Sequence, residues 1–288
     1  MIQEHVNIGA KTTMRIGGTA HYYAELTTKD DVEAAWAFAL EHDVPMIPLG
    51  GGSNTVFADG EIEALVVRIK NEDMKIEGNQ VRVGSGKNLV VLINELAKHD
   101  LDLSPLTGIL GTVGGAVFGN AGQGPHGIWI DRYVKEVSVF WEGDWRVLKG
   151  ADCDFGYRES IFKHGPDAHP LIWEVLLELP TVARADIEAT VQTLLKKRLE
   201  TQPHIKTAGS CFKAVGGTPA WQLIDAADLR GHHVGDVEIS EKHANFLINK
   251  GKATFEDAVS LVEHVKQHVD GKLDVEMRFI GSDGSLVF

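Results

Sequence analysis

The stretch Pro48-Leu49-Gly50-Gly51-Gly52-Ser53-Asn54-Thr55 places three consecutive glycines between an apolar run and two small polar side chains. Backbone without side chains lets amide N–H groups approach a bound oxyanion closely, and successive N–H groups in a turn form an anion-binding nest. Ser53 and Asn54 add neutral hydrogen-bond donors, so the stretch suits a pyrophosphate. A tight turn in which the glycines only supply positive φ is the alternative that these residues leave open.

A second bare segment runs from Gly108 to Gly127 and holds eight glycines with almost no charge. It also carries Leu, Val, Phe, Ile and Trp, which disordered loops avoid. We therefore predict a buried turn system with close backbone approach. Two such segments could hold both ends of a dinucleotide. A P-loop motif is absent, and Leu89 stands where a Rossmann fingerprint beginning at Gly84 needs its third glycine.

The composition describes an ordinary globular protein of two or three domains, with 288 residues of which 43% are hydrophobic. Lys and Arg number 28 against 41 Asp and Glu, a net charge of −13, which disfavours binding to nucleic acid or to an anionic membrane. An anionic ligand stays possible because a site can be locally positive. The N-terminus lacks an apolar signal core and no run of 18 apolar residues occurs, so we expect a cytoplasmic protein.

Metal and disulfide signals are weak. The 13 histidines show neither H-E-x-x-H nor Cys/His finger spacing, so we expect no metal site. Cys153 and Cys211 are expected to be free thiols. We predict no obligate protein partner.

Helix and strand patterns alternate along the chain, which predicts an α+β fold. Thr28, with Asp31 three residues later, is the expected N-cap of the first helix. The sequence TQPHIKTAGS (201–210) breaks the pattern and is the best candidate for a domain boundary. Helix 185–200 is expected to bury an apolar face of Ile187, Val191, Leu194, Leu195 and Leu199. The predicted helices cover 28–42, 87–99, 185–200, 219–229 and 255–269, the last capped by Thr254, and the predicted strands cover 64–69, 80–85, 132–141, 171–179, 245–249 and 272–280.

Seven stretches together resemble the UDP-N-acetylenolpyruvoylglucosamine reductase family. They occur in the family's order and span nearly the whole chain, so the ordered set is specific although each stretch alone is weak. The chain departs from the family pattern at Leu110 and Thr207, where relatives have Pro, and at Ala214-Val215, where they have Asn-Pro. The stretches are NIGAKTTMRIGGTAHYYAE (7–25), PLGGGSN (48–54), GILGTVGGAVFGNAG (108–122), FGYRESIFK (155–163), AGSCFK (208–213), LRGHHVGDVEISEKHANFLINKGKAT (229–254) and VEMRFIG (275–281).

The resemblance implies a vanillyl-alcohol-oxidase-like (PCMH-type) two-lobed FAD-binding fold plus a smaller α+β substrate domain. The first lobe would comprise 1–70, joined by the C-terminal strand in 271–288; the second lobe would be 71–200, and the substrate domain 201–270. Thr19 stands where some relatives carry a flavin-linking histidine, so the resemblance implies non-covalent FAD. The cofactor-binding residues it implies are Arg15, Gly17, Gly50, Gly51, Gly52, Ser53, Asn54, Gly111, Thr112, Gly114 and Gly115.

The activity that the resemblance implies is NADPH-dependent reduction of the enolpyruvyl group of a UDP-sugar, in peptidoglycan synthesis. Arg158 would stabilise the developing anion, Ser210 would donate a proton, and Glu276 would support the intermediate. From the residues alone, Arg158 could instead form an ion pair with Glu159 or Asp154, Ser210 could be a turn residue, and Glu276 could lie on a half-exposed strand. The implied substrate-binding residues are Tyr157, Lys163, Lys213, His243 and Asn245, in a form of the family that lacks an extra tyrosine loop.

Three alternatives to this activity stay open. One is a flavoprotein of the same fold that acts on another substrate. The second is a flavin- or nucleotide-binding protein without turnover, which the departure at Ala214-Val215 leaves possible. The third is a sugar-nucleotide binder without flavin, which would be colourless when purified.

Overall fold

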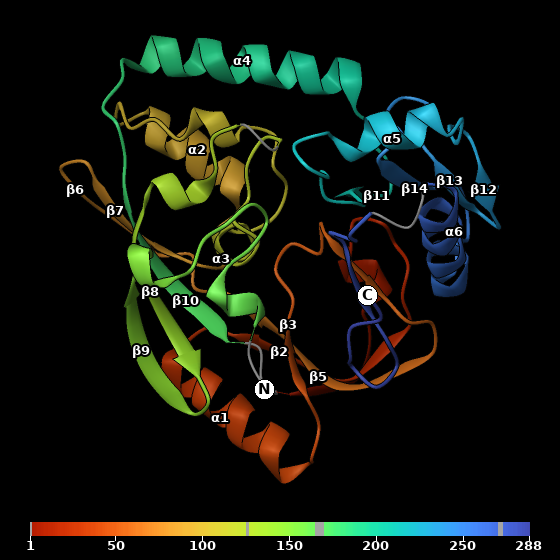
Figure 1. The fold of residues 1–288 in the computed structure, drawn as a ribbon. Coiled ribbons are helices and arrows are strands. Elements are labelled where there is room, and N and C mark those ends of the chain that lie inside the picture. The colour runs from red at the N-terminus through yellow and green to blue at the C-terminus, as the bar shows by residue number, and fades with distance from the viewer. Residues whose placement is uncertain (1, 125–126, 165–169, 270–272) are drawn as a thin grey trace.

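The computed structural model, which describes residues 2–124, 127–164, 170–269 and 273–288, contains three larger sheets, each with its own helices, and one two-stranded sheet (Figure 1). The first sheet has the order β1-β2-β5-β3, the second β6-β7-β10-β8-β9, and the third β11-β14-β13-β12. Short 3₁₀ helices punctuate the loops at Gly9–Lys11, Ser104–Leu106, Ile130–Arg132, Gly150–Asp152 and Ile161–Lys163.

The first sheet is mixed, because β2 and β3 both run parallel to β5 while β1 is antiparallel to β2. Helix α1 makes the crossover between β2 and β3, and it starts where the sequence predicts. Thr28 accepts a hydrogen bond from the N–H of Asp31, and the Asp31 carboxylate accepts one from the N–H of Thr28, a capping box that satisfies two orphan donors. The elements are β1 (Gln3–Asn7), β2 (Thr19–Leu26), α1 (Lys29–Glu41), β3 (Met46–Pro48) and β5 (Glu61–Ile69).

The second sheet is antiparallel throughout. Its apolar side chains pack with α2 into one core, where Leu89, Leu92, Ile93 and Leu96 are buried as the helical period predicts. The glycine-rich segment differs from our prediction, because it contains a short helix, α3, as well as turns. The elements are β6 (Met74–Glu77), β7 (Gln80–Gly84), α2 (Leu89–Ala97), α3 (Val113–Phe118), β8 (Val134–Trp141), β9 (Asp144–Lys149) and β10 (Leu171–Glu178).

Helix α4 (Arg184–Thr201) joins the second sheet to the third across the top of the molecule (Figure 1). We expected an apolar face of five side chains to be buried, and that expectation was wrong. Ile187 is its one buried residue, while Leu195 and Leu199 are 37% and 59% exposed. The reason is that the C-terminal half of α4 borders a cavity instead of a packed layer.

The third sheet is small and antiparallel, and helix α6 packs on it with the predicted cap at Thr254. Its core includes Leu261, Val262 and Val265. The elements are β11 (Thr207–Ser210), α5 (Ala220–Ala226), β12 (His233–Val234), β13 (Val237–Ile239), β14 (Phe246–Asn249) and α6 (Phe255–His268).

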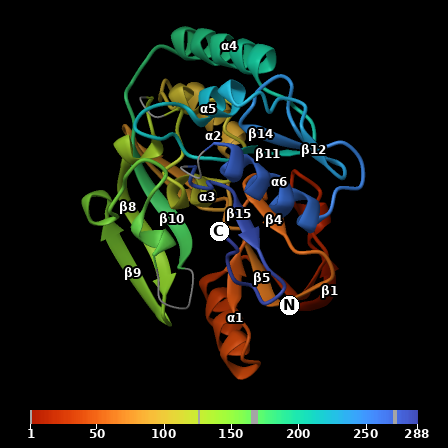
Figure 2. The ribbon, with the colours of Figure 1, turned by 45° about the vertical axis from the view of Figure 1, so that its right-hand side comes forward.

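The chain then returns to its beginning, because β15 (Arg278–Ile280) pairs in parallel with β4 (Thr55–Phe57), directly after the triple glycine (Figure 2). The predicted strand 272–280 is therefore too long. Lys272 lies outside the described residues, and Glu276 lies in an irregular segment before β15. No helix in the described part of the chain combines the length and the apolarity that a membrane span requires.

Candidate active site

The two glycine-rich stretches form one wall, although 57 residues separate them. The hydroxyl of Ser53 donates to the carbonyl of Leu110 at 2.7 Å. A Cβ built on Gly51 would lie 2.7 Å from the Cα of Gly111, so the backbones of the two turns are in contact. This is the arrangement that a shared dinucleotide site requires.

The turns present free backbone donors on this wall. Among the described residues, no acceptor receives a hydrogen bond from the N–H groups of residues 50–54 or of residues 110–112. Backbone donors in folded proteins are rarely left without a partner, and successive free N–H groups make a nest for an anion. The observation fits the diphosphate of FAD.

The structure also shows which of the three glycines at 50–52 needs a positive φ. Gly52 has a φ of +66° and requires glycine, whereas Gly50 and Gly51 do not adopt positive φ. Gly51 is bare because of its contact with Gly111. The turn interpretation therefore holds at Gly52, and the anion-binding interpretation of the stretch stays a prediction.

Replacing Gly51 with Ala should weaken FAD binding. The added Cβ would clash with the backbone of Gly111, and a backbone cannot relieve the clash by changing a side-chain rotamer. Overpacking of this kind costs roughly 1–3 kcal/mol, or about 5- to 150-fold in the dissociation constant. Fluorescence titration of the apoprotein with FAD measures it. The control is Gly156→Ala, because Gly156 does not line the cavity and its Cβ would meet its nearest neighbour at 3.5 Å. Equal FAD affinity in the two variants would contradict the placement.

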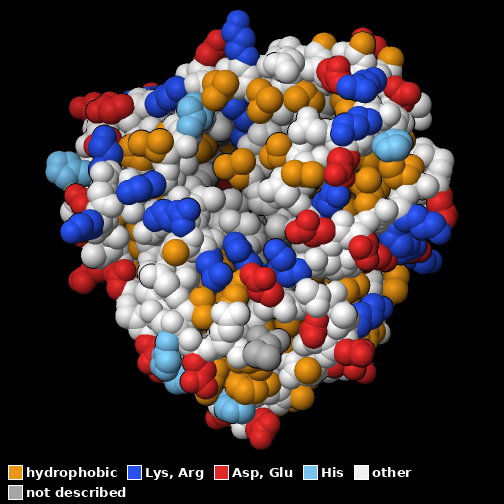
Figure 3. Space-filling model, turned by 180° about the vertical axis from the view of Figure 1, so that it is seen from behind, with side chains coloured by type: hydrophobic (Ala, Val, Ile, Leu, Met, Phe, Trp, Pro, Cys, Tyr) orange, Lys and Arg blue, Asp and Glu red, His pale blue; other side chains and the backbone are white. Residues whose placement is uncertain are grey.

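One large cavity, about 1860 Å³ in volume, opens in front of this wall. Sites for single drug-sized ligands usually measure about 300–1,000 Å³, so the volume suits a dinucleotide together with a second ligand. Residues from all three sheets line it, and Figure 3 shows a hollow bordered by Lys and Arg side chains.

The cavity is positive although the protein carries a net charge of −13. Of the described residues that line it, eleven are Lys or Arg and two are Glu. Such a concentration of one sign attracts and holds anionic ligands. The cations are Lys11, Arg15, Arg68, Arg158, Lys163, Lys197, Arg198, Lys206, Arg230, Lys242 and Arg278, and the anions are Glu200 and Glu276.

Arg158 is held from three sides at this cavity. Its Nη2 donates to the carbonyl of Gly122 at 2.8 Å, and its Nη1 donates to that of Asn120 at 3.4 Å. Its Nε lies 2.8 Å from Oε1 of Glu276, and both side chains are less than 15% exposed. The ion-pair partner is thus Glu276, and the alternatives Glu159 and Asp154 are wrong. Arg158 has a φ of +59°, a strained conformation that recurs at functional sites.

Burial raises the pKa of the Glu276 carboxyl, while the charges of Arg158, Lys163 and Lys213 oppose that rise. The Glu276 N–H donates to the carbonyl of Cys211 at 2.7 Å. The Asn54 side chain donates to the carbonyl of Glu276 at 3.2 Å. Glu276 therefore connects the glycine wall to the segment that follows β11.

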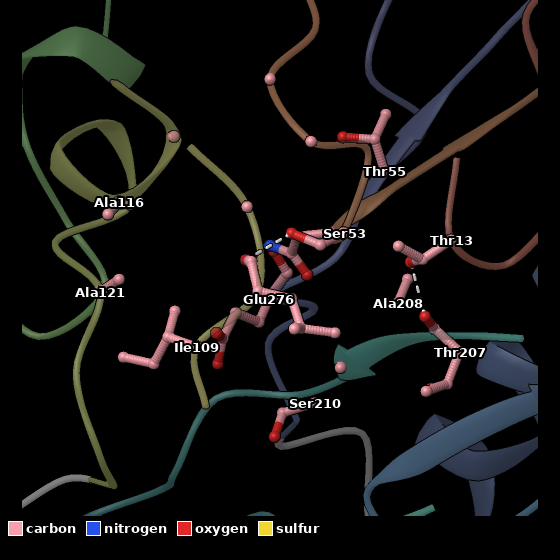
Figure 4. Close-up of a pocket in the computed structure, with 18 of the residues that line it drawn as sticks. Thr13, Ser53, Thr55, Ile109, Ala116, Ala121, Thr207, Ala208, Ser210 and Glu276 are labelled. Atoms are coloured by element: carbon pink, nitrogen blue, oxygen red, sulfur yellow. Dashed lines mark hydrogen bonds between the residues drawn. The ribbon is translucent and has the colours of Figure 1, made fainter. Parts of the chain in front are cut away.

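Ser210 ends β11 and lies opposite Phe246 of β14. Ser210, Ser53 and Glu276 lie around the same cavity (Figure 4). Cys211 is fully buried beside Ser210, and burial raises the pKa of its thiol. Two other lining residues of the cavity are in contact, because Thr13 Oγ1 donates to the carbonyl of Thr207 at 2.6 Å (Figure 4).

Both polar atoms of the Asn245 side chain form hydrogen bonds with backbone groups. Its Oδ1 accepts from the N–H of Phe212 at 2.9 Å, and its Nδ2 donates to the Phe212 carbonyl at 2.8 Å. Asn245 therefore fixes the segment after Ser210. Its predicted contact with substrate stays a prediction.

The other predicted substrate residues are placed as follows. The Tyr157 hydroxyl accepts from the N–H of Ala214 at 3.3 Å. Lys163 donates to the Arg158 carbonyl, and burial lowers the pKa of its amine. Lys213 pairs with Glu159 and is not among the lining residues.

His243 lines the cavity beside Trp221 and Phe246. Burial, with the charge of Arg230, lowers its pKa to about 4. The imidazole is therefore neutral near pH 7, and its Nδ1 accepts from the N–H of Asn245 at 3.3 Å. A neutral ring between aromatic neighbours suits a flat, uncharged part of a ligand.

Of the two cofactor-binding residues predicted near the N-terminus, Arg15 lines the cavity and Gly17 does not. The Nη1 of Arg15 donates to the carbonyl of Ala10. The φ of +133° at Gly17 and the 2.9 Å between a built Cβ and the Cβ of Phe57 give this glycine a packing reason instead.

Comparison with known proteins decides the family. A family model described as UDP-N-acetylenolpyruvoylglucosamine reductase, C-terminal domain, matches residues 199–279, and one described as FAD binding domain matches residues 20–144. UDP-N-acetylenolpyruvoylglucosamine reductase 2 of Symbiobacterium thermophilum is 36% identical over 92% of this chain and 86% of its own length. The chain belongs to the UDP-N-acetylenolpyruvoylglucosamine reductase family.

Two further members of this reductase family support the same assignment. The reductase of Aquifex aeolicus is 35% identical over 95% of this chain and 93% of its own. The crystal structure of the reductase from Thermus caldophilus superposes with a TM-score of 0.84 at 31% identity, covering 97% of this chain and 99% of that one. The predicted two-lobed FAD-binding fold with FAD as cofactor is confirmed.

Our sequence-based list of reductase residues missed Arg198. This side chain of α4 lines the cavity and lies against Gly108, and its Nη1 donates to Gln202 at 3.2 Å. Its Nε is buried without a hydrogen-bond partner, and no carboxylate among the described residues pairs with it. Burial, with the charge of Arg158, lowers its pKa. The only local signal was a basic residue in the last turn of a helix, which is common at helix ends.

Proposed function

We propose that the cavity carries out the reaction of its family, the NADPH-dependent reduction of UDP-N-acetylglucosamine enolpyruvate to UDP-N-acetylmuramate in peptidoglycan synthesis. The observation that carries the proposal is the union of a bare, donor-rich wall with an Arg–Glu pair and a serine on one positive cavity. Homologues with this name, each matched over most of its length, support the same reaction.

The glycine wall is the part of the site that would hold FAD, through the free N–H groups of residues 50–54 and 110–112. Bound there, FAD would supply the hydride transfer from NADPH to the enolpyruvyl double bond. The chain's own residues then have to bind the substrate anion, stabilise charge on its carboxylate and supply a proton.

Arg158 meets the first two requirements because its planar guanidinium can grip a carboxylate as negative charge grows on it. Three contacts already fix its orientation, so little reorganisation is needed during the reaction. We assign the proton to the Ser210 hydroxyl. No described residue hydrogen-bonds this hydroxyl, which leaves it available to the ligand.

The remaining assignments are also proposals. Residues 1–70 with 271–288 and residues 71–200 would form the two FAD lobes, and residues 201–270 would bind the UDP-sugar; one sheet for each range supports this division. We place the protein in the cytoplasm, which the two unpaired buried cysteines support. We propose no nucleic-acid or obligate protein partner.

Two measurements test the function. The protein purified without added cofactor should show a flavin absorption spectrum; a colourless protein would remove flavin chemistry from the site. The anaerobically reduced protein, mixed with UDP-N-acetylglucosamine enolpyruvate in a stopped-flow instrument, should reoxidise rapidly. Reoxidation at the same slow rate with and without this substrate would favour a flavin-binding protein without turnover.

Arg198→Met should raise the KM for the UDP-sugar while leaving FAD bound. A hydrogen bond to a charged group contributes roughly 1.5–3 kcal/mol, which corresponds to about 10- to 150-fold in affinity. A buried cation without a carboxylate partner destabilises the fold, so Met should preserve or raise the melting temperature. Steady-state kinetics and thermal unfolding measure the two effects.

The matched control is Lys196→Met, since Lys196 is exposed on the same helix and does not line the cavity. It should leave KM unchanged. A lower melting temperature with unchanged KM in Arg198→Met would show that Arg198 is a structural residue.

A further inference from the structure

Two histidines and two glutamates meet on one face of the first sheet, outside the cavity lining. His5 lies on β1, His21 on the neighbouring β2, and Glu61 and Glu63 on β5, which pairs with β2. Side chains two residues apart on a strand share a face, so the two carboxylates point the same way. None of the four residues lines the cavity.

The ligand atoms of three of these residues are spaced as a metal ion requires. The Nδ1 of His21 lies 3.5 Å from Oε1 of Glu61 and 3.3 Å from Oε2 of Glu63. All three atoms lie within 4.8 Å of one another. Tetrahedral zinc with bonds of about 2.0–2.1 Å separates its ligand atoms by about 3.3 Å. Two of the three separations therefore match the edges of a tetrahedral site, and the third is at most 4.8 Å.

The Nδ1 of His21 gives an independent reason to expect a bound ion. Solvent does not reach this nitrogen, and it makes no hydrogen bond in the described structure although two carboxylate oxygens face it. Buried polar atoms normally have a partner, and a cation between the nitrogen and the two oxygens would supply one.

His5 completes the arrangement. Its Nδ1 lies 2.7 Å from Oε1 of Glu61, within ion-pair distance. Carboxylates that bind metals are commonly oriented by a second polar partner. The spacing rules applied to the sequence could not detect this group, because its members come from three strands.

We propose that His21, Glu61 and Glu63 bind a divalent first-row transition ion of the zinc class, with His5 orienting Glu61 and a water in the fourth position. One imidazole nitrogen and two carboxylate oxygens suit zinc. The ion would tie β2 to β5, and through His5 it would also hold the edge strand β1. Because the unfolded chain lacks the site, binding would stabilise the fold.

Isothermal titration of the tag-free holoprotein with ZnCl₂ tests the proposal. We expect one ion per chain, and a melting temperature that rises with zinc. Titration with Co²⁺ should give the visible absorption of tetrahedral cobalt. His21→Ala and Glu63→Gln should each weaken zinc binding more than His5→Ala, for which a loss of roughly 10-fold is typical of a residue that orients a ligand.

The control addresses adventitious binding to surface histidines. His232, His264 and His268 stack elsewhere on the molecule, with ring centroids 4.1 and 4.0 Å apart, so His264→Ala removes the main competing group. It should leave zinc affinity unchanged. Unchanged binding in His21→Ala, loss of binding in His264→Ala, or no binding to the unaltered protein would each overturn the proposal. Reductase activity serves as a separate readout and should persist in all these variants, so a failure here leaves the family reaction untouched.

Discussion

Ser210→Ala should slow reoxidation of the reduced protein by the enolpyruvyl substrate by roughly 10²- to 10⁴-fold, the usual contribution of a positioned proton donor. Reduction by NADPH should keep its rate, because that half-reaction needs no proton from Ser210. Stopped-flow measurement of each half-reaction separates the two. The reason is geometric: Ser210 lines the cavity, and the carbonyl of the next residue, Cys211, accepts a hydrogen bond from the N–H of Glu276.

Ser53→Ala is the matched control, since it removes the same atom from another part of the cavity. Its hydroxyl donates to the Leu110 carbonyl and holds the two glycine turns together. We expect weaker FAD retention in this variant and, once FAD is saturating, two nearly normal half-reactions. If Ser210→Ala slowed both half-reactions equally, its role would be structural.

Local signals in the sequence were sufficient where local chemistry decides the structure. The capping boxes at Thr28 and Thr254 involve residues three positions apart, so the helix starts could be predicted from a few letters. The two glycine stretches were visible for the same reason. Their contact through Gly51 and Gly111 was not, because no local rule says which distant turn a bare backbone meets.

The predictions failed where contacts with residues far along the chain determine the local structure or its burial. The apolar residues of α4 suggested a buried face, yet Leu199 borders the cavity. Periodicity reports that a face meets something apolar or a ligand, and it does not distinguish a packed layer from a binding site. Glu276 likewise leaves the expected strand, because its N–H bonds Cys211 instead of a neighbouring strand.

The ion pair of Arg158 and Glu276 gives the second prediction. Arg158→Met should lower the free energy of unfolding by roughly 3–5 kcal/mol, since it leaves the Glu276 charge buried without its partner. Turnover should also fall, by about 10²- to 10³-fold, the usual effect of removing one donor to a developing anion. Denaturant unfolding and steady-state kinetics measure the two quantities.

The variant should also gain a pH dependence of stability. Burial already raises the pKa of Glu276, and Arg158 opposes that rise, so removing the cation raises the pKa further. A folded-state pKa above the unfolded value means that the stabilisation is fully present below the ordinary pKa of Glu. It is then lost as the pH rises through the raised value. The loss of stability in Arg158→Met, relative to the unaltered protein, should therefore be smallest in acid and grow as the pH rises.

The double variant Arg158→Met with Glu276→Gln separates structure from chemistry. It contains no buried charge at either position, and replacing a whole buried pair by neutral residues is often close to neutral for stability. Most of the lost unfolding free energy should return, and the added pH dependence should disappear. Turnover should stay low, because no guanidinium remains to bind the substrate carboxylate. Recovery of turnover together with stability would show that the pair only supports the fold.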